Sequence, residues 1–177
     1  MAKARLADIT LPSFGMPEIR PELPADIYPA RITRLRERAA SARYDRIVVY
    51  ADREHSANLS YLSGFDPRFE EALLVLGPTG DPAILVGNEN VGMATAAPLK
   101  MRLVMFQHFS LPGQPRDRTA PLGETLASEG IGKGSRVGVI GWKTYPSPEA
   151  IDAPAYIVDE LRRLPARPVS SRTPRDS

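Results

Sequence analysis

The apolar residues of the chain gather in short, uninterrupted runs that are typical of strands, and the first three of these runs are typical of buried strands. Such runs occur at residues 47–50, 72–76, 83–86, 103–106 and 137–140. Each has the length of an ordinary strand and contains Val, Ile or Leu as its main component. The second and third runs are separated by Gly-Pro-Thr-Gly-Asp-Pro, which is turn chemistry. These two runs are therefore predicted to pair as an antiparallel hairpin.

Between the runs lie segments with the three- and four-residue apolar spacing of amphipathic helices. A helix is predicted over residues 29–43, with an inward face made of Ile32, Leu35, Ala39 and Ala42. Another is predicted over residues 154–164, with an inward face made of Tyr156, Ile157, Leu161 and Leu164. Shorter helices are expected at residues 56–61 and 121–129, and a weakly helical segment at residues 88–98.

Strands that are separated by helices predict a layered α/β domain, and the hairpin makes its sheet mixed. Hydrophobic residues make up 42% of the 177 residues and charged residues 25%, which is a globular balance. Of the 18 prolines, five fall in the first 29 residues and three in the last 13. We therefore expect a proline-rich N-terminal arm over residues 1–29, one domain over residues 30–164, and a polar, proline-broken tail over residues 165–177.

Charge and composition exclude several classes of protein. The net charge is only +2, with basic and acidic residues interleaved, so no nucleic-acid surface is expected. Cysteine is absent, which excludes disulfides and thiolate catalysis. No signal peptide and no apolar run of membrane-spanning length is evident, so we expect a cytoplasmic protein with no membrane contact.

One stretch of the sequence carries a family resemblance. Residues 44–50 read Tyr-Asp-Arg-Ile-Val-Val-Tyr, and residues 56–65 contain Tyr-Leu-Ser-Gly-Phe. Together with the strands at residues 71–76 and 82–87, this order resembles the N-terminal domain of the creatinase, prolidase and Xaa-Pro aminopeptidase family. The resemblance implies a mixed sheet flanked by helices, with a topology like that of ribonuclease H.

In that family a C-terminal "pita-bread" domain carries two Asp, one His and two Glu around two divalent metals. Residues 165–177 offer none of this, where a last strand and then the catalytic domain should follow. We therefore expect this chain to lack the catalytic domain, to hold no metal or other cofactor, and to have no catalytic residue or activity of its own.

The stretch with the most side chains suited to acid/base chemistry or metal binding is Asp52-Arg53-Glu54-His55, directly after a predicted strand. The other histidine, His108, lies 53 residues further along, and no metal-binding spacing occurs. Loops at the carboxyl ends of strands are where α/β folds meet ligands, and in relatives this edge faces the substrate cleft. Arg53 and His55 are therefore candidate contacts with a peptide or a neighbouring subunit, although a solvated polar loop explains them equally simply.

Three further contact candidates are Phe65 and Arg68, in an aromatic turn, and Trp142, just past the last strand. Trp, Tyr and Arg often anchor interfaces, but each of these side chains could instead pack on its own domain. The glycine-rich residues 130–135 precede a strand and do not match a phosphate-binding loop. No nucleophile elbow is present, so serine hydrolase chemistry is not expected.

The sequence thus predicts the non-catalytic N-terminal domain of an Xaa-Pro aminopeptidase- or creatinase-like metallopeptidase. Such a domain would shape substrate access and subunit contacts, as a homo-oligomer or by docking to a catalytic domain. Two alternatives stay open: a stand-alone module that binds peptides or proteins, and half of an enzyme that a separate metal domain completes in trans.

Overall fold

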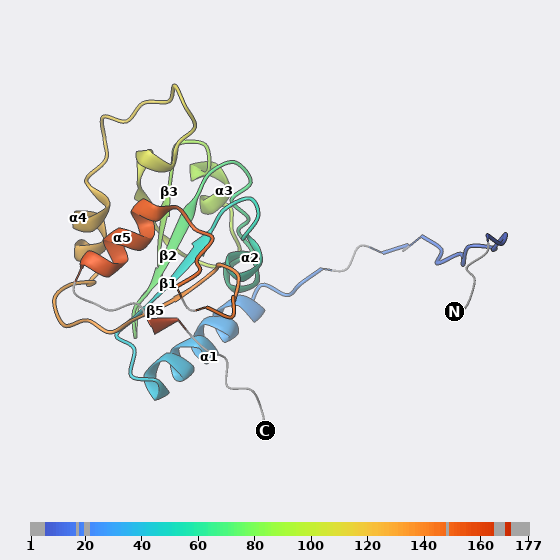
Figure 1. The fold of residues 1–177 in the computed structure, drawn as a ribbon, viewed down its shortest axis with the longest axis horizontal. Helices are drawn as coiled ribbons and strands as arrows, with labels where there is room; N and C mark the ends of the chain where they lie inside the picture. Colours follow the sequence, from blue (N-terminus) through green and yellow to red (C-terminus); the bar gives the residue numbers. More distant parts are fainter. Residues whose placement is uncertain (1–5, 17, 20–21, 148, 165–168, 171–177) are drawn as a thin grey trace.

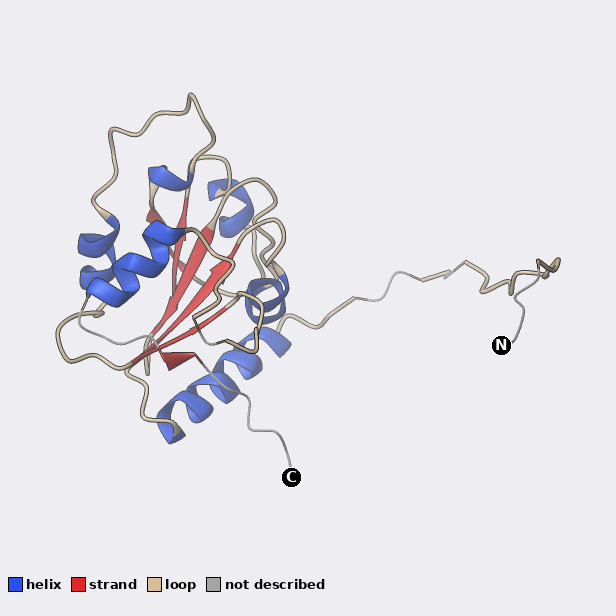
Figure 2. Ribbon diagram, viewed as in Figure 1, coloured by secondary structure: helices blue, strands red, loops and turns tan. Residues whose placement is uncertain are grey.

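The apolar runs form one mixed sheet with the strand order β4-β3-β2-β1-β5-β6 (Figure 1, Figure 2). The computed structural model describes residues 6–16, 18–19, 22–147, 149–164 and 169–170. Its strands are β1 (Arg46–Ala51), β2 (Ala72–Leu76), β3 (Ala83–Val86), β4 (Arg102–Met105), β5 (Val137–Ile140) and β6 (Val169–Ser170). β2 and β3 pair antiparallel, so the predicted hairpin and the mixed α/β sheet are confirmed.

Because side chains alternate along a strand, each central strand supplies both faces of the sheet. Val48 and Tyr50 of β1 belong to one buried apolar cluster, whereas Ile47 and Val49 belong to the other. All five residues of β2 are buried. This is why the runs that form β1, β2 and β3 contain no polar positions: a strand covered on both faces has no solvent side. The run that forms β4 lies at the edge of the sheet and is partly exposed.

Helices cover both faces of the sheet. One side carries α1 (Ile27–Ser41), α2 (Ala57–Ser63) and α3 (Val91–Thr95). The other carries the short 3-10 helix η1 (Gln107–Phe109), α4 (Leu122–Ser128) and α5 (Ala155–Arg163). Figure 1 shows α4 and α5 on the left of the sheet, α2 on its right and α1 below it. The two apolar clusters lie between these layers and the sheet.

The end of α2 shows why this local sequence folds as it does. Gly64 follows the helix with φ +75°, a left-handed conformation that ends helices and favours glycine. A Cβ at this position would also lie 2.4 Å from Cγ of Pro98. Glycine is therefore required twice over, by the backbone and by the close approach of the segment after α3.

Three expectations about side-chain faces and boundaries need correction. The first helix begins at Ile27 because Tyr28, in its first turn, is buried in the core. Ala42 is exposed because the helix ends at Ser41 and the chain turns at Arg43, where φ is +58°. Tyr156 is 43% exposed, and Val158 occupies the inward position next to Ile157 instead.

The polar tail also differs from the expectation. Residues 169–170 form β6, which pairs in parallel with β5, so a last strand is present where none was expected. The rest of the predicted tail, residues 165–168 and 171–177, lies outside the described residues.

Strand direction sets the position of the candidate site. β1 is parallel to β5, β3 is parallel to β4, and β2 runs against both β1 and β3. The carboxyl ends of β1, β3, β4 and β5 therefore meet at one edge of the sheet, where β2 begins. We call this the carboxyl edge.

Candidate functional site

Polar loops crowd the carboxyl edge of the sheet. They are residues 52–55 after β1, 87–90 after β3, 106–110 after β4 and 141–143 after β5, together with residues 65–71 before β2. Open α/β sheets bind ligands in the space outside the carboxyl ends of their strands. This edge is therefore the first place to look for a functional site.

A histidine bridges two of these loops. Nδ1 of His55 lies 2.8 Å from Oδ1 of Asp52, and Nε2 lies 3.0 Å from Oδ2 of Asp152, which precedes α5. Nζ of Lys143, after β5, lies 2.9 Å from Oδ2 of Asp152. The hydroxyl of Tyr50 donates to Oδ2 of Asp52 at 2.6 Å. We call Asp52, His55, Lys143 and Asp152 the His55 clasp.

The clasp favours a charged histidine. A ring that faces carboxylates at both nitrogens donates at both only as an imidazolium. Burial by itself lowers the pKa of His55, but the hydrogen bonds to Asp152 and Asp52 outweigh it and raise that pKa above 6.5. Burial likewise raises the pKa of Asp152, but hydrogen bonds from His55 and Lys143 outweigh it and hold this pKa well below 3.8.

A buried carboxylate holds the neighbouring loop. Glu70 is 4% exposed, and its two oxygens accept hydrogen bonds from the backbone N–H groups of Glu89, at 3.1 Å, and Asn90, at 3.2 Å. Gly87 leaves room for it, since a Cβ there would lie 2.5 Å from Oε1 of Glu70. Glu70 thereby fixes the turn between β3 and α3.

Amide side chains fasten the long loop that follows η1. Nε2 of Gln107 donates to Oδ1 of Asn88 at 3.0 Å, and Nδ2 of Asn88 donates to the carbonyl of Pro115 at 3.0 Å. The backbone N–H of Arg118 donates to Oε1 of Gln107 at 2.6 Å. Residues 111–118 are all exposed, and their loop projects beyond the sheet at the top of Figure 1. The loop is thus exposed yet held at its base.

Some polar groups at this edge have no partner within the described residues. Both carboxylate oxygens of Glu89 and both polar side-chain atoms of Asn90 are buried and make no hydrogen bond there. Buried polar atoms in folded proteins nearly always have a partner, which can be water, another chain or a ligand.

A hollow of about 690 Å³ opens beside the edge, between α5, α4 and η1. Phe106, Leu122 and Tyr156 contribute its apolar and aromatic walls. Its carboxylates are Glu71, Asp159 and Glu160; its cation, Arg163, lies 2.7 Å from Glu160. Carboxylates thus outnumber the cation, and the hollow favours a positively charged group attached to an apolar one.

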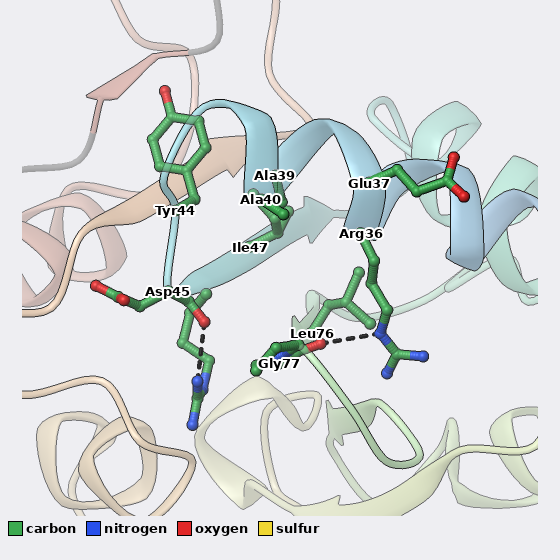
Figure 3. A pocket seen from close by; sticks show the side chains of 11 residues that line it. Arg36, Glu37, Ala39, Ala40, Tyr44, Asp45, Ile47, Leu76 and Gly77 are labelled. Carbon is green, nitrogen blue, oxygen red and sulfur yellow. Dashed lines mark hydrogen bonds between the residues drawn. The ribbon is translucent and has the colours of Figure 1, made fainter.

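A smaller hollow, of about 270 Å³, lies at the opposite edge, where α1 ends and β1 begins (Figure 3). Its guanidinium groups are bonded to the backbone. Nε of Arg36 donates to the carbonyl of Gly77 at 3.0 Å, and Nε of Arg46 donates to the carbonyl of Glu129 at 2.9 Å. These bonds join helices to strand ends, so this hollow is a structural junction.

The comparison with protein families decides what kind of domain this is. Residues 31–153 match the family model described as the creatinase/prolidase N-terminal domain. The match covers well over half of the chain, and it includes the strands and loops of the carboxyl edge.

The chain belongs to the creatinase/prolidase N-terminal domain family. No curated protein matches it.

Solved structures share the fold of this creatinase/prolidase N-terminal domain. Dipeptidase PepE from Mycobacterium ulcerans is 16% identical with a TM-score of 0.56, and the match covers 85% of this chain and 36% of that one. The creatinase/prolidase N-terminal domain of an X-Pro dipeptidase from Streptococcus pyogenes is 12% identical with a TM-score of 0.55, covering 80% and 92%. A creatinase/prolidase-like N-terminal domain from Corynebacterium diphtheriae is 22% identical with a TM-score of 0.52, covering 82% and 98%.

These identities establish the fold and not the activity. The chain spans about a third of the dipeptidase from Mycobacterium ulcerans and nearly all of the two isolated N-terminal domains. Within the described residues, no three His, Cys, Asp or Glu side chains lie together as a metal site requires. No helix in that part of the chain has the length and apolar character of a membrane crossing.

The predicted contact residues of this domain lie in different environments. Arg53 is fully at the surface of the carboxyl edge, with 83% of its side chain exposed, next to the buried ring of His55. Arg68 is exposed and lies 3.3 Å from Asp66. Phe65 is 2% exposed and belongs to the core, whereas Trp142 is half-buried and packs against the core cluster under α5.

Sequence reasoning singled out His55 but missed what holds it. Asp152 and Lys143 lie in a long loop with no motif, and Asp152 is 97 residues from His55. The sequence analysis singled out neither Glu70 nor Gln107. Their signal in the sequence is weak: each is a polar residue directly beside an apolar run.

Proposed function

We propose that this creatinase/prolidase N-terminal domain is the non-catalytic part of a metal-dependent peptidase of the Xaa-Pro type, where it shapes substrate access and makes contacts between subunits. The observation that carries the proposal is the carboxyl edge, whose loops are tied down by the His55 clasp, by Glu70 and by Gln107. Loops fixed in this way present their exposed side chains in one arrangement, which lowers the entropy cost of binding.

The charges at this edge support a peptide as the molecule that passes it. Arg53, two residues before His55, and Lys143, which contacts the same Asp152 as His55, are exposed cations, and cations pair with a carboxylate. Glu71 and Asp159 in the hollow are anions that suit an ammonium group. A short peptide carries both groups, and Tyr156 and Phe106 supply apolar walls for its side chains.

The hollow also favours the second candidate, a stand-alone module that binds a peptide or a protein. A concave site with aromatic walls and a few charges is the ordinary form of a ligand pocket. In that case binding would need no catalytic domain.

The proposal is tested first by an activity assay. The 177-residue chain, with and without added manganese, cobalt or zinc, is expected to hydrolyse no Xaa-Pro peptide. Metal-dependent turnover that co-purifies with the chain and is lost on His55→Ala or His108→Ala would overturn the non-catalytic assignment.

A titration then separates the candidates. The amide spectrum of the labelled chain is recorded with a proline dipeptide, and with the same peptide blocked at both termini as a control. Shifts near His55 and Glu71 with the free peptide alone favour the binding module. Shifts that require a separately expressed catalytic domain of the family favour the access-shaping role. Shifts confined to other surfaces contradict both.

A further inference from the structure

The N-terminal segment carries an unusual amount of exposed apolar surface. Its large apolar side chains are all 60–103% exposed; they are Leu6, Ile9, Leu11, Phe14, Met16, Ile19 and Leu23. They recur every two to four residues over residues 6–23. We call the described residues of this segment, 6–16, 18–19 and 22–26, the arm. Linkers that stay free in solution are poor in such residues, because exposed apolar side chains find a partner.

The arm leaves its own domain. Figure 1 shows it running from the start of α1 away from the sheet and its helices. Prolines such as Pro12 and Pro24 favour an extended chain, which spans about 3 Å per residue, so residues 6–23 reach roughly 50 Å. A domain of this size has a diameter of only about 35–40 Å. The arm is long enough to cross a neighbouring domain.

One strand of the sheet offers an unpaired side. β4 ends the strand order, so only one of its two sides is hydrogen-bonded within the described residues. The N–H groups of Arg102 and Phe106 donate to carbonyls of Pro82 and Val86, each at 2.8 Å. In a parallel pair of strands, every second residue directs its N–H and C=O groups toward the partner strand. Leu103 and Met105 alternate with the bonded residues, so their N–H and C=O groups point away from β3.

The surroundings of this free side are apolar. Leu103 on β4 is 39% exposed, and Met93 on the contacting helix α3 is also 39% exposed. The exposed cation of this strand, Arg102, is already paired with Glu129. An extended peptide can add to such an edge through backbone hydrogen bonds while its side chains contact the apolar neighbours. Residues 8–11 of the arm, Asp-Ile-Thr-Leu, precede Pro12 and have every backbone N–H available.

The area is sufficient for a stable dimer. Burying one large apolar side chain contributes about 1.5–3 kcal/mol, and each Å² of buried apolar surface contributes about 25 cal/mol. One such side chain therefore buries roughly 60–120 Å². The apolar side chains of one arm then supply roughly 400–800 Å². Two arms and the equal area that they cover on the partners come to roughly 1,600–3,200 Å², which reaches the roughly 1,200–2,000 Å² of a standard interface.

We propose that the arm docks onto a second copy of this chain, with residues 8–11 pairing along the free side of β4 and the apolar side chains covering Met93 and Leu103. A reciprocal exchange of arms gives a closed two-fold dimer. This inference specifies the subunit contacts of the role proposed above, and it does not depend on the access-shaping part of that role.

The test is the oligomeric state of the full chain, measured by light scattering and sedimentation over a concentration series. The wild type is expected to be a dimer. Ile9→Asp with Leu11→Asp in the arm, and separately Leu103→Lys on β4, are expected to give folded monomers, with native circular dichroism and a Tm that no longer rises with protein concentration. Glu18→Ala is the matched control in the arm and is expected to stay dimeric.

Mixing the arm variant with Leu103→Lys provides the decisive measurement. The Leu103→Lys variant has an intact arm, and the arm variant has an intact β4. In the mixture the intact arm can dock on the intact β4, so one of the two contacts is restored and a heterodimer forms. A strictly monomeric wild type overturns the proposal, as does a dimer that persists in the arm variant. Loss of the dimer in the arm variant but not in Leu103→Lys overturns β4 as the acceptor, and so does failure of the mixture to associate.

Discussion

Replacing His55 by glutamine removes the charged bridge between Asp52 and Asp152 while keeping a polar side chain in its place. The ring is only 9% exposed and faces both carboxylates at 2.8 and 3.0 Å. Hydrogen bonds to charged groups each contribute about 1.5–3 kcal/mol, and such bonds are not additive when they share a residue. Lys143 still pairs with Asp152 in the variant. We therefore expect a loss of about 3 kcal/mol at pH 6.

The loss depends on pH in a direction that follows from the pKa shifts. The folded state raises the pKa of His55 above its ordinary value of 6.5, so its stabilisation is complete below pH 6.5 and is lost as the pH rises through the folded pKa. The folded state lowers the pKa values of Asp52 and Asp152 below 3.8, so their stabilisation is present above pH 3.8 and is lost on acidification. The clasp is strongest between pH 3.8 and 6.5.

The measurement is the free energy of unfolding by urea at a series of pH values from 5 to 9. The wild type is expected to lose stability above pH 6.5, with a slope of up to about 1.4 kcal/mol per pH unit for one proton. His55→Gln is expected to abolish this slope. His108→Gln is the matched control, because His108 is the other histidine of the chain and is exposed. An identical slope in the wild type and His55→Gln would refute the charged bridge.

Three further substitutions test the packing around the site by thermal or urea unfolding. Gly141→Ala places a Cβ 2.0 Å from the carbonyl oxygen of Tyr50 at φ +125°, so it should lower the free energy of unfolding by roughly 3 kcal/mol or more. Gly132→Ala, with open space around it, should change that free energy little, and equal stabilities of the two variants would contradict this. Leu74→Ala, at a fully buried position of β2, should lower the free energy of unfolding by about 2–5 kcal/mol. Leu103→Ala, on the edge strand β4, should lower it by about 1 kcal/mol or less. Glu70→Gln sets an amide N–H₂ against a backbone N–H and should cost about 1–3 kcal/mol, with faster hydrogen exchange at Glu89 and Asn90; unchanged exchange would remove Glu70 as their anchor.

The strands were predictable from the sequence because their signal is local. A run such as residues 72–76 contains no polar position, and only a strand covered on both faces tolerates that pattern. Face assignments within helices were less secure, since they depend on where the helix ends. Ala42 fits the spacing of α1 but lies beyond Ser41, so it never reaches the core.

The partners within the site were not predictable, because they join distant parts of the chain. Nothing near His55 in the sequence points to Asp152, which the parallel pairing of β1 with β5 brings to the same edge. The burial of Glu70 has the same origin. Its carboxylate is favourable inside the protein only because β2 and β3 place the N–H groups of Glu89 and Asn90 against it.

The position of β1 has a consequence for synthesis on the ribosome. β1 lies between β2 and β5, and its partner residue for Arg46 is Val137, 91 residues later. β2, β3 and β4 can assemble on one side of β1 long before β5 has been translated. During that interval the other side of β1 is an unpaired, strongly apolar strand edge, which is a template for pairing with another nascent chain. The interval closes only when residues 137–140 have left the ribosome, so slow translation of residues 88–136 should increase aggregation of the nascent protein.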